Sequence, residues 1–116
     1  MKNNIVKDKS FAFALDIVSL YSDVTEKKEY VMSKQLLRSG TAIGALIREA
    51  EHAESKADFV HKLSIALKEA NETDYWIDLL YQSNFISSNT YKKMNLSVIE
   101  LIKLLVSIIK TSKQNK

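Results

Sequence analysis

Two histidines stand close to carboxylates in this sequence, and they are the first residues to consider for chemistry. Glu49 and His52 have the Glu-x-x-His spacing that di-iron proteins use in four-helix bundles, and Asp58 and His61 have nearly the same pattern. A dinuclear site requires all of its ligands to project into the bundle. At about 100° per residue, these four side chains face away from the apolar positions of their helices. We therefore predict no metal and no cofactor here.

Hydrolytic chemistry is the next possibility. Arg48 and His52 resemble the Arg and His pair of some ribonuclease bundles, but the spacing is one residue too short for the usual pattern. The chain has no cysteine and two histidines, and it contains no glycine-rich phosphate loop and no Gly-x-Ser-x-Gly elbow. We predict no catalytic residues and a protein that is not an enzyme.

The elements that carry these residues read as helices. The chain has 116 residues, no proline and only two glycines, with 46% apolar and 27% charged residues, which is enough for one domain over 1–116 with its own core. Ser55 followed by Asp58 is a helix start signal. We predict an all-α, antiparallel, up-down-up-down four-helix bundle with helices at 9–24, 28–52, 56–83 and 88–112.

Apolar residues recur at steps of three and four along the helices and predict the core. The third helix has the clearest seam, and in the first helix a second group, Phe11, Leu15 and Val18, is expected to widen the core stripe. The small residues Gly40 and Gly44 suit a close approach of two backbones, either within the core or against a neighbouring subunit. The predicted seams are Phe13, Ile17, Leu20 and Val24; Met32, Leu36, Ile43, Ile47 and Ala50; and Phe59, Leu63, Ala66, Ala70, Thr73, Ile77 and Leu80.

Some apolar residues are left over by this core. Ile65, Trp76 and Leu79 point away from the third-helix seam, and nine of the twelve residues from 98 to 109 are apolar, more than one buried face can use. These residues need a second partner, which a monomer does not supply. We predict self-association through an interface that includes Ile65, Trp76, Leu79, Ile99 and Val106.

Charge is concentrated near the end of the chain. The net charge is +3, yet residues 87–116 hold six basic and one acidic group. One stripe of basic side chains lies opposite the core of the second helix, and the three lysines of a second stripe, on the fourth helix, fall within roughly 20° of one another. Oligomer symmetry would multiply both stripes. We predict that they contact RNA or DNA; in a competing account, the basic fourth helix docks on Asp58, Glu69 and Glu72 of a neighbour. The stripes are Lys34, Arg38 and Arg48, and Lys92, Lys103 and Lys110.

The N-terminal residues are polar and lack the apolar region of a secretory signal, and the most apolar stretch, 98–109, is too short and too charged to span a membrane. We expect a cytoplasmic protein.

Three segments, 35–50, 54–63 and 66–76, resemble a known family, the bacterial four-helix bundle proteins related to the 23S ribosomal RNA intervening-sequence protein. The resemblance implies a homopentamer with a central channel, no established enzymatic activity and a nucleic-acid-associated role. Similar proteins include the accessory protein of diversity-generating retroelements, a basic pentamer that contacts nucleic acid and a reverse transcriptase. By this likeness Arg38 and Arg48 fall on the signature segment of the family.

These observations lead to two hypotheses. The first is a non-enzymatic, homo-oligomeric scaffold, pentameric by the resemblance, that contacts RNA or DNA through its basic residues. The alternative is a protein-binding adaptor without a nucleic-acid role, whose charged faces serve subunit and partner contacts.

Overall fold

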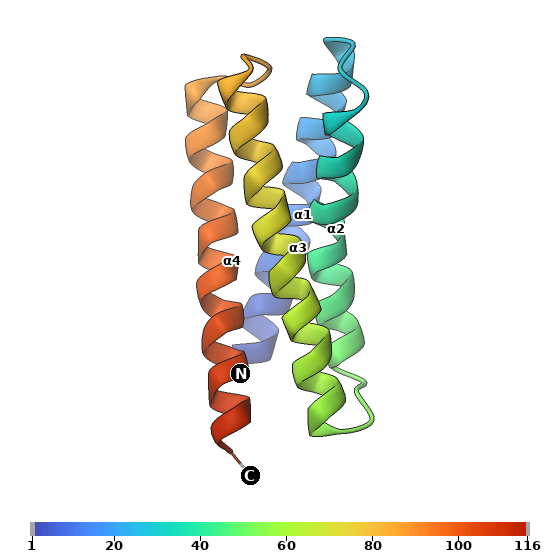
Figure 1. The fold of residues 1–116 in the computed structure, drawn as a ribbon, viewed down its shortest axis with the longest axis vertical. Helices are drawn as coiled ribbons and strands as arrows, with labels where there is room; N and C mark the ends of the chain where they lie inside the picture. The colour runs from blue at the N-terminus through green and yellow to red at the C-terminus, as the bar shows by residue number, and fades with distance from the viewer. Residues whose placement is uncertain (1, 116) are drawn as a thin grey trace.

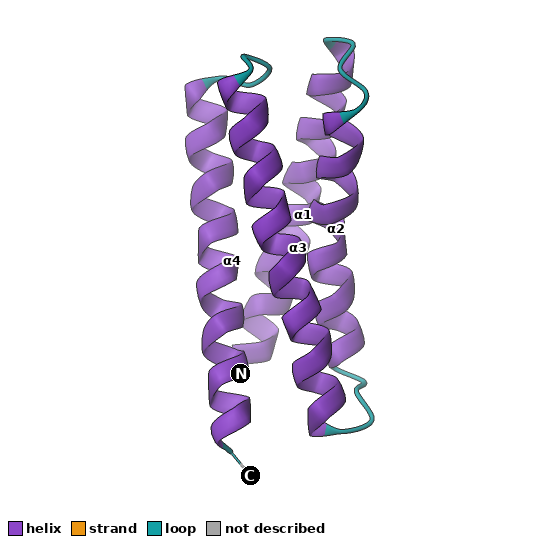
Figure 2. Cartoon of the chain, viewed as in Figure 1, coloured by secondary structure: helices purple, strands orange, loops and turns teal. Residues whose placement is uncertain are grey.

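The computed structural model describes residues 2–115 as four long helices joined by short turns (Figures 1 and 2). Within this range no residue is in a β-strand. The described chain is therefore all-α, as the absence of proline and of alternating strand patterns indicated. The helices are α1 (Lys2–Glu26), α2 (Met32–Ala50), α3 (Lys56–Gln82) and α4 (Ser88–Gln114).

The helices run along the long axis of a rod with extents of 49 × 21 × 19 Å. Contacts join α1 to α2, α2 to α3, α3 to α4 and α1 to α4, whereas the described parts of the diagonal pairs, α1 with α3 and α2 with α4, do not approach within 8 Å between Cα atoms. Consecutive helices run in opposite directions, as Figure 1 shows. This is an antiparallel four-helix bundle with each helix at one corner.

The core follows the predicted seams. In α3 the buried residues are Leu63, Ala66, Ala70, Thr73, Ile77 and Leu80, and in α2 they include Leu36, Ile43, Ile47 and Ala50. In α1 the seam from Phe13 to Val24 is buried, but the expectation that Phe11, Leu15 and Val18 widen it is wrong. These three side chains are 49%, 58% and 50% exposed because they lie on the opposite side of the helix.

Two helix starts differ from the sequence-based ranges. Helix α1 begins at Lys2 rather than near residue 9, because Val6 extends the core seam and is 1% exposed. Helix α2 begins at Met32 rather than at residue 28, because Lys28 adopts a left-handed conformation (φ 65°) that ends α1. The carboxylate of Glu29 then accepts hydrogen bonds from the backbone N–H groups of Val31, Met32 and Ser33. Three donors at the start of α2 are thereby satisfied.

Helix α3 begins at Lys56, as the sequence predicts. Ser55 has extended backbone angles, and its side chain accepts a hydrogen bond of 3.0 Å from the backbone N–H of Asp58. A serine N-cap of this kind is worth about 1 kcal/mol of stability. The carboxylate of Asp58 in turn accepts from the backbone N–H of Glu54 at 3.3 Å. Both the backbone N–H and the carboxylate of Asp58 are therefore engaged in hydrogen bonds within this turn.

Between α1 and α2 the backbones approach closely at Gly40, which packs within the core. A Cβ atom at this position would lie 2.7 to 2.9 Å from the side-chain carbons of Ile17, which is fully buried. Four residues further along α2, Gly44 has ordinary spacing, with Ser10 Oγ at 3.4 Å from such a Cβ. The two glycines therefore have different surroundings on the same helix.

Candidate functional site

The basic residues of α2 are exposed, but two of them already have partners in the chain. The guanidinium of Arg38 forms ion pairs with Glu69, at 3.5 Å, and with Glu72, both on α3. On the other flank of α2, the guanidinium of Arg48 lies 5.0 Å from the centre of the Phe11 ring on α1. Lys34 is exposed and forms no ion pair with any residue that the structure describes. The stripe therefore spreads over both flanks of the helix.

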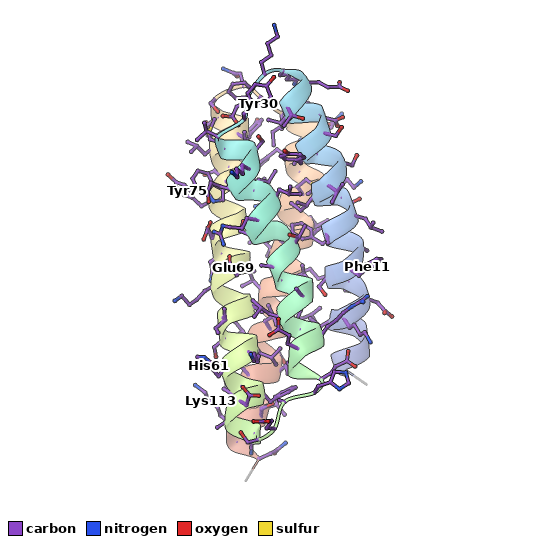
Figure 3. All side chains as sticks on the ribbon, turned by 90° about the vertical axis from the view of Figure 1, so that its right-hand side faces the viewer. Phe11, Tyr30, His61, Glu69, Tyr75 and Lys113 are labelled. Carbon is purple, nitrogen blue, oxygen red and sulfur yellow. The ribbon has the colours of Figure 1, made fainter. Side chains whose placement is uncertain are left out.

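Glu72 connects this stripe to Trp76. The indole Nε1 of Trp76 donates to Glu72 at 3.0 Å, and this hydrogen bond, together with that from Arg38, lowers the pKa of Glu72 against the raising effect of burial. The hydrogen bond between Arg38 and Glu72, together with the negative charge of Glu72, raises the pKa of Arg38. Thus the polar edge of Trp76, which the sequence predicts at a subunit interface, is satisfied inside the chain. The site is an ion-pair network that links α2 and α3 (Figure 3 labels Glu69).

The basic residues of α4 have a different environment. Lys92, Lys103 and Lys110 are exposed, and none of them forms an ion pair with the side chains of residues 5–115. Two apolar side chains on the same side of the helix are exposed with them, Leu96 at 74% and Val106 at 46%. Leu96 and Lys103 also line a shallow groove with Ile99, Glu100 and Leu104. This face is both cationic and apolar.

The two predicted basic stripes do not meet in one chain. Helices α2 and α4 occupy diagonal corners of the bundle, so their outward faces point in opposite directions. Lys34, Arg38 and Arg48 therefore cannot act on a single nucleic-acid strand together with the lysines of α4 unless the strand wraps the rod or several copies combine. Helical periodicity predicts the face of each residue on its own helix, but the diagonal arrangement is a property of the bundle.

The predicted interface residues also fall into two groups. Ile65, Trp76 and Leu79 on α3 are partly buried within the chain. On α4, Ile99 is partly buried and Val106 is exposed. The structure adds an apolar surface that the sequence analysis assigned to the core, namely Phe11, Leu15 and Val18 on α1. Their spacing of four and three residues was the signal, because it places all three on the side of α1 opposite Phe13 and Ile17.

A second groove runs beside this surface, between α1 and α2. Its lining residues are small or apolar apart from one arginine: Phe11, Ala14, Thr41, Gly44, Ala45 and Arg48. Phe11 stands at the outer edge of α1 in Figure 3. The groove and the exposed α1 side chains therefore form one continuous, largely apolar area.

The residues with metal-ligand spacing are dispersed. Glu49 forms an ion pair with Lys62 at 3.2 Å, the carboxylate of Asp58 accepts from the backbone N–H of Glu54 just before α3, and His52 and His61 are exposed. Among the side chains of residues 5–115, no group of three or more His, Asp or Glu residues is placed to hold a metal ion. None of the helices in that part of the chain is both long and apolar enough to cross a membrane.

The fold and its surfaces define a class of protein, the all-α four-helix bundle with open, charged outer faces. The family described as 23S rRNA-intervening sequence protein matches residues 2–107, so the chain belongs to this family. It is similar to a solved structure from Bacteroides thetaiotaomicron, a protein with unknown function from the S23 ribosomal protein family. The two are 60% identical with a TM-score of 0.92, over 95% of this chain and 99% of the other. Comparison with curated proteins gave no match.

Proposed function

We propose that this protein is a non-enzymatic scaffold that assembles into a homo-oligomer of five copies and contacts RNA or DNA through basic side chains. The family name connects its members with 23S rRNA, and the resemblance of residues 35–50 to the family segment implies a pentamer. The observation that carries the nucleic-acid contact is the exposed basic stripe on α2, where Lys34, Arg38 and Arg48 all reach solvent.

The α2 stripe suits a phosphate backbone because its neighbours are small. Thr41 and Ala45 lie between the basic residues, so a strand can approach the helix closely. From Lys34 to Arg48 the stripe is about 21 Å long, at about 1.5 Å per residue. On α4, by contrast, the exposed apolar side chains Leu96 and Val106 stand among the lysines. Such side chains cannot donate hydrogen bonds to phosphate oxygens. We therefore assign the nucleic-acid contact to α2.

The alternative function is a protein-binding adaptor, and one observation favours it. The charge of Arg38 is compensated by Glu69 and Glu72, although 52% of its side chain stays exposed. A nucleic-acid phosphate would have to compete with these two carboxylates. A partner protein that contacts the whole network would not.

The test is a filter-binding titration with mixed-sequence RNA and DNA over a series of salt concentrations. The double variant Lys34→Gln/Arg48→Gln removes two cations from the stripe and leaves the Arg38 ion pairs in place. Removing one phosphate contact should reduce the slope of log K against log salt by about 0.7 to 0.9, so we expect a reduction of about 1.4 to 1.8 per chain engaged, with weaker binding. The matched control, Lys56→Gln/Lys113→Gln, removes two exposed cations at the end of the bundle and should leave the slope unchanged.

Absence of binding at low salt by the unmodified protein contradicts the nucleic-acid function and leaves the adaptor. Equal slopes for the two double variants place the contact elsewhere than on α2. Charge reversal of Arg38 and Arg48 separates the roles further, because a failure to assemble with intact folding identifies them as interface residues.

A further inference from the structure

The outward face of α1 carries an apolar strip with a carboxylate near each end, and the guanidinium of Arg48 lies 5.0 Å from the centre of its Phe11 ring. We call Phe11, Leu15 and Val18 the α1 strip; each is about half exposed. The exposed carboxylates of Asp8 and Glu26 lie within about 55° of this row on the helix, as does Lys7, which pairs with Glu51. Neither carboxylate forms an ion pair with the side chains of residues 5–115. A half-exposed phenylalanine, leucine and valine in one row form an unusual surface for a chain that remains alone in water.

The outward face of α4 also carries exposed apolar side chains, and the charged residues among them are lysines. We call Leu96, Ile99 and Val106 the α4 strip; Lys92 and Lys110 lie at its ends, and Lys103 stands between Ile99 and Val106. The outermost charges match in spacing as well as in sign. From Asp8 to Glu26 and from Lys92 to Lys110 the separation is the same, about 27 Å at about 1.5 Å per residue.

We propose that the α1 strip of one copy packs against the α4 strip of a second copy of this chain. The inference rests on the self-association in the proposed function and names the two surfaces that make it. Apolar side chains occupy the middle of the α1 strip and lie on both sides of Lys103 in the α4 strip, and charges of opposite sign, Asp8 and Glu26 against Lys92 and Lys110, lie at the ends. Because each strip has the same sign at both ends, the match holds whether the two helices run parallel or antiparallel.

The carboxylates of α3 are a less suitable docking surface for the α4 lysines of a second copy than those of α1. Glu69 and Glu72 already neutralise Arg38 within the chain, and the carboxylate of Asp58 accepts from the backbone N–H of Glu54 in the turn before α3. Asp8 and Glu26 beside the α1 strip have no such partners among the side chains that the structure describes. Docking of α4 on α1 therefore brings free charges of both signs together without breaking an existing ion pair.

The positions of the two helices in the bundle allow such a contact to close into a ring. A contact between two different surfaces is heterologous, and it closes only when the rotation from copy to copy divides a full turn. Helices α1 and α4 are neighbours, and the outward directions of neighbouring corners in a square bundle differ by about 90°. Each copy is then rotated by about 90°, which closes a ring of about four copies, whereas a ring of five needs a rotation of about 72°.

The same geometry places α2 where the proposed function needs it. In such a ring the side of the bundle between α1 and α4 faces the centre, and α2 and α3 face outward. The lysines of α4 are then occupied by a neighbouring copy, while Lys34 stays accessible and Arg48, whose guanidinium lies over the Phe11 ring, stands at the edge of the contact. The predicted basic residues thus divide into a subunit contact on α4 and a nucleic-acid contact on α2.

The test uses two variants that each damage one strip, Leu15→Asp and Leu96→Asp. Light scattering of the unmodified protein should give a multiple of 13.2 kDa, whereas each variant alone should give 13.2 kDa. An equimolar mixture should recover a complex of two copies, because the intact α4 strip of the first variant meets the intact α1 strip of the second. Both positions are exposed, so circular dichroism should show unchanged helix content; Leu15→Gln and Leu96→Gln serve if either aspartate variant unfolds.

Tyr75→Lys is the matched control, because Tyr75 is 59% exposed on α3 and lies outside both strips. It should keep the mass of the unmodified protein. Persistence of the oligomer in either strip variant overturns the pairing of α1 with α4, and so does a mixture that stays at 13.2 kDa. Dissociation by Tyr75→Lys would also overturn it, since the contact would then include α3. An unmodified protein that is monomeric at micromolar concentration instead contradicts the self-association in the proposed function.

Discussion

Replacing each helical glycine by alanine tests the packing of α1 on α2. Both changes gain the same intrinsic helix propensity, about 1 kcal/mol relative to glycine. At Gly40 the new methyl group would lie 2.7 to 2.9 Å from three carbons of the buried Ile17 side chain, too close for an unshifted neighbour. Overpacking of this kind costs about 1 to 3 kcal/mol. We expect Gly40→Ala to change stability by between about 0 and −2 kcal/mol.

Gly44→Ala is the matched change on the same helix. Its methyl group meets Ser10 Oγ at 3.4 Å, an ordinary contact, so the propensity gain should be realised and stability should rise by up to about 1 kcal/mol. The propensity term cancels in the difference between the two variants. That difference measures the overpacking alone, about 1 to 3 kcal/mol, or about 4 to 12 °C in Tm at about 4 °C per kcal/mol for a domain of this size.

Urea unfolding followed by circular dichroism measures both variants, at one fixed protein concentration because assembly would make stability depend on concentration. A double-mutant cycle locates the strain. Ile17→Ala removes all three crowded carbons, so it should cost less in the Gly40→Ala background than alone. Equal stability of Gly40→Ala and Gly44→Ala would refute the reasoning, because α1 and α2 would then accommodate the extra methyl group beside Ile17 without a loss of stability.

Two further changes test the helix starts. Ser55→Ala removes the acceptor for the backbone N–H of Asp58 and should lower the free energy of unfolding by about 1 kcal/mol in urea melts, whereas Ser55→Gly should cost only a few tenths. Burial raises the pKa of Glu29, but hydrogen bonds from the backbone of Ser33, Met32 and Val31 outweigh it and hold the pKa below 4.5. This contribution is complete above about pH 4.5 and is lost as pH falls through the folded-state pKa, so acid titration of stability should be shallower for Glu29→Gln; identical acid profiles would contradict the role of Glu29.

The core was predictable because helical periodicity encodes it directly. The α3 seam from Leu63 to Leu80 is buried as its spacing indicates, and Ser55 caps the helix as its position before Asp58 indicates. Periodicity alone, however, gives two apolar sides to α1 and does not state which one the other helices cover. Phe13 and Ile17 are covered while Leu15 is not, and that choice follows from the packing of α2 and α4 around α1.

The start of α2 was less predictable because it depends on an unusual local conformation and an unusual local cap. Lysine seldom adopts the left-handed conformation that ends a helix, so Lys28 gave no signal of a boundary. Glu29 then acts as a cap from outside the helix, where serine, threonine, aspartate or asparagine is the usual signal. Both residues instead favoured a continuous helix by composition.

The state of each basic residue depends on contacts that no single helix reveals. On a helical wheel Arg38 and Lys103 are equivalent, since both point away from the core of their own helix. In the bundle Arg38 faces two carboxylates of α3, whereas Lys103 has none among the described residues and stands between Ile99 and Val106. A cation with an internal counter-charge and a cation beside uncovered apolar surface respond to different partners. Arg38 can bind a new anion only in exchange for the carboxylates of α3. Lys103 suits a partner that covers the apolar side chains beside it and supplies a negative charge.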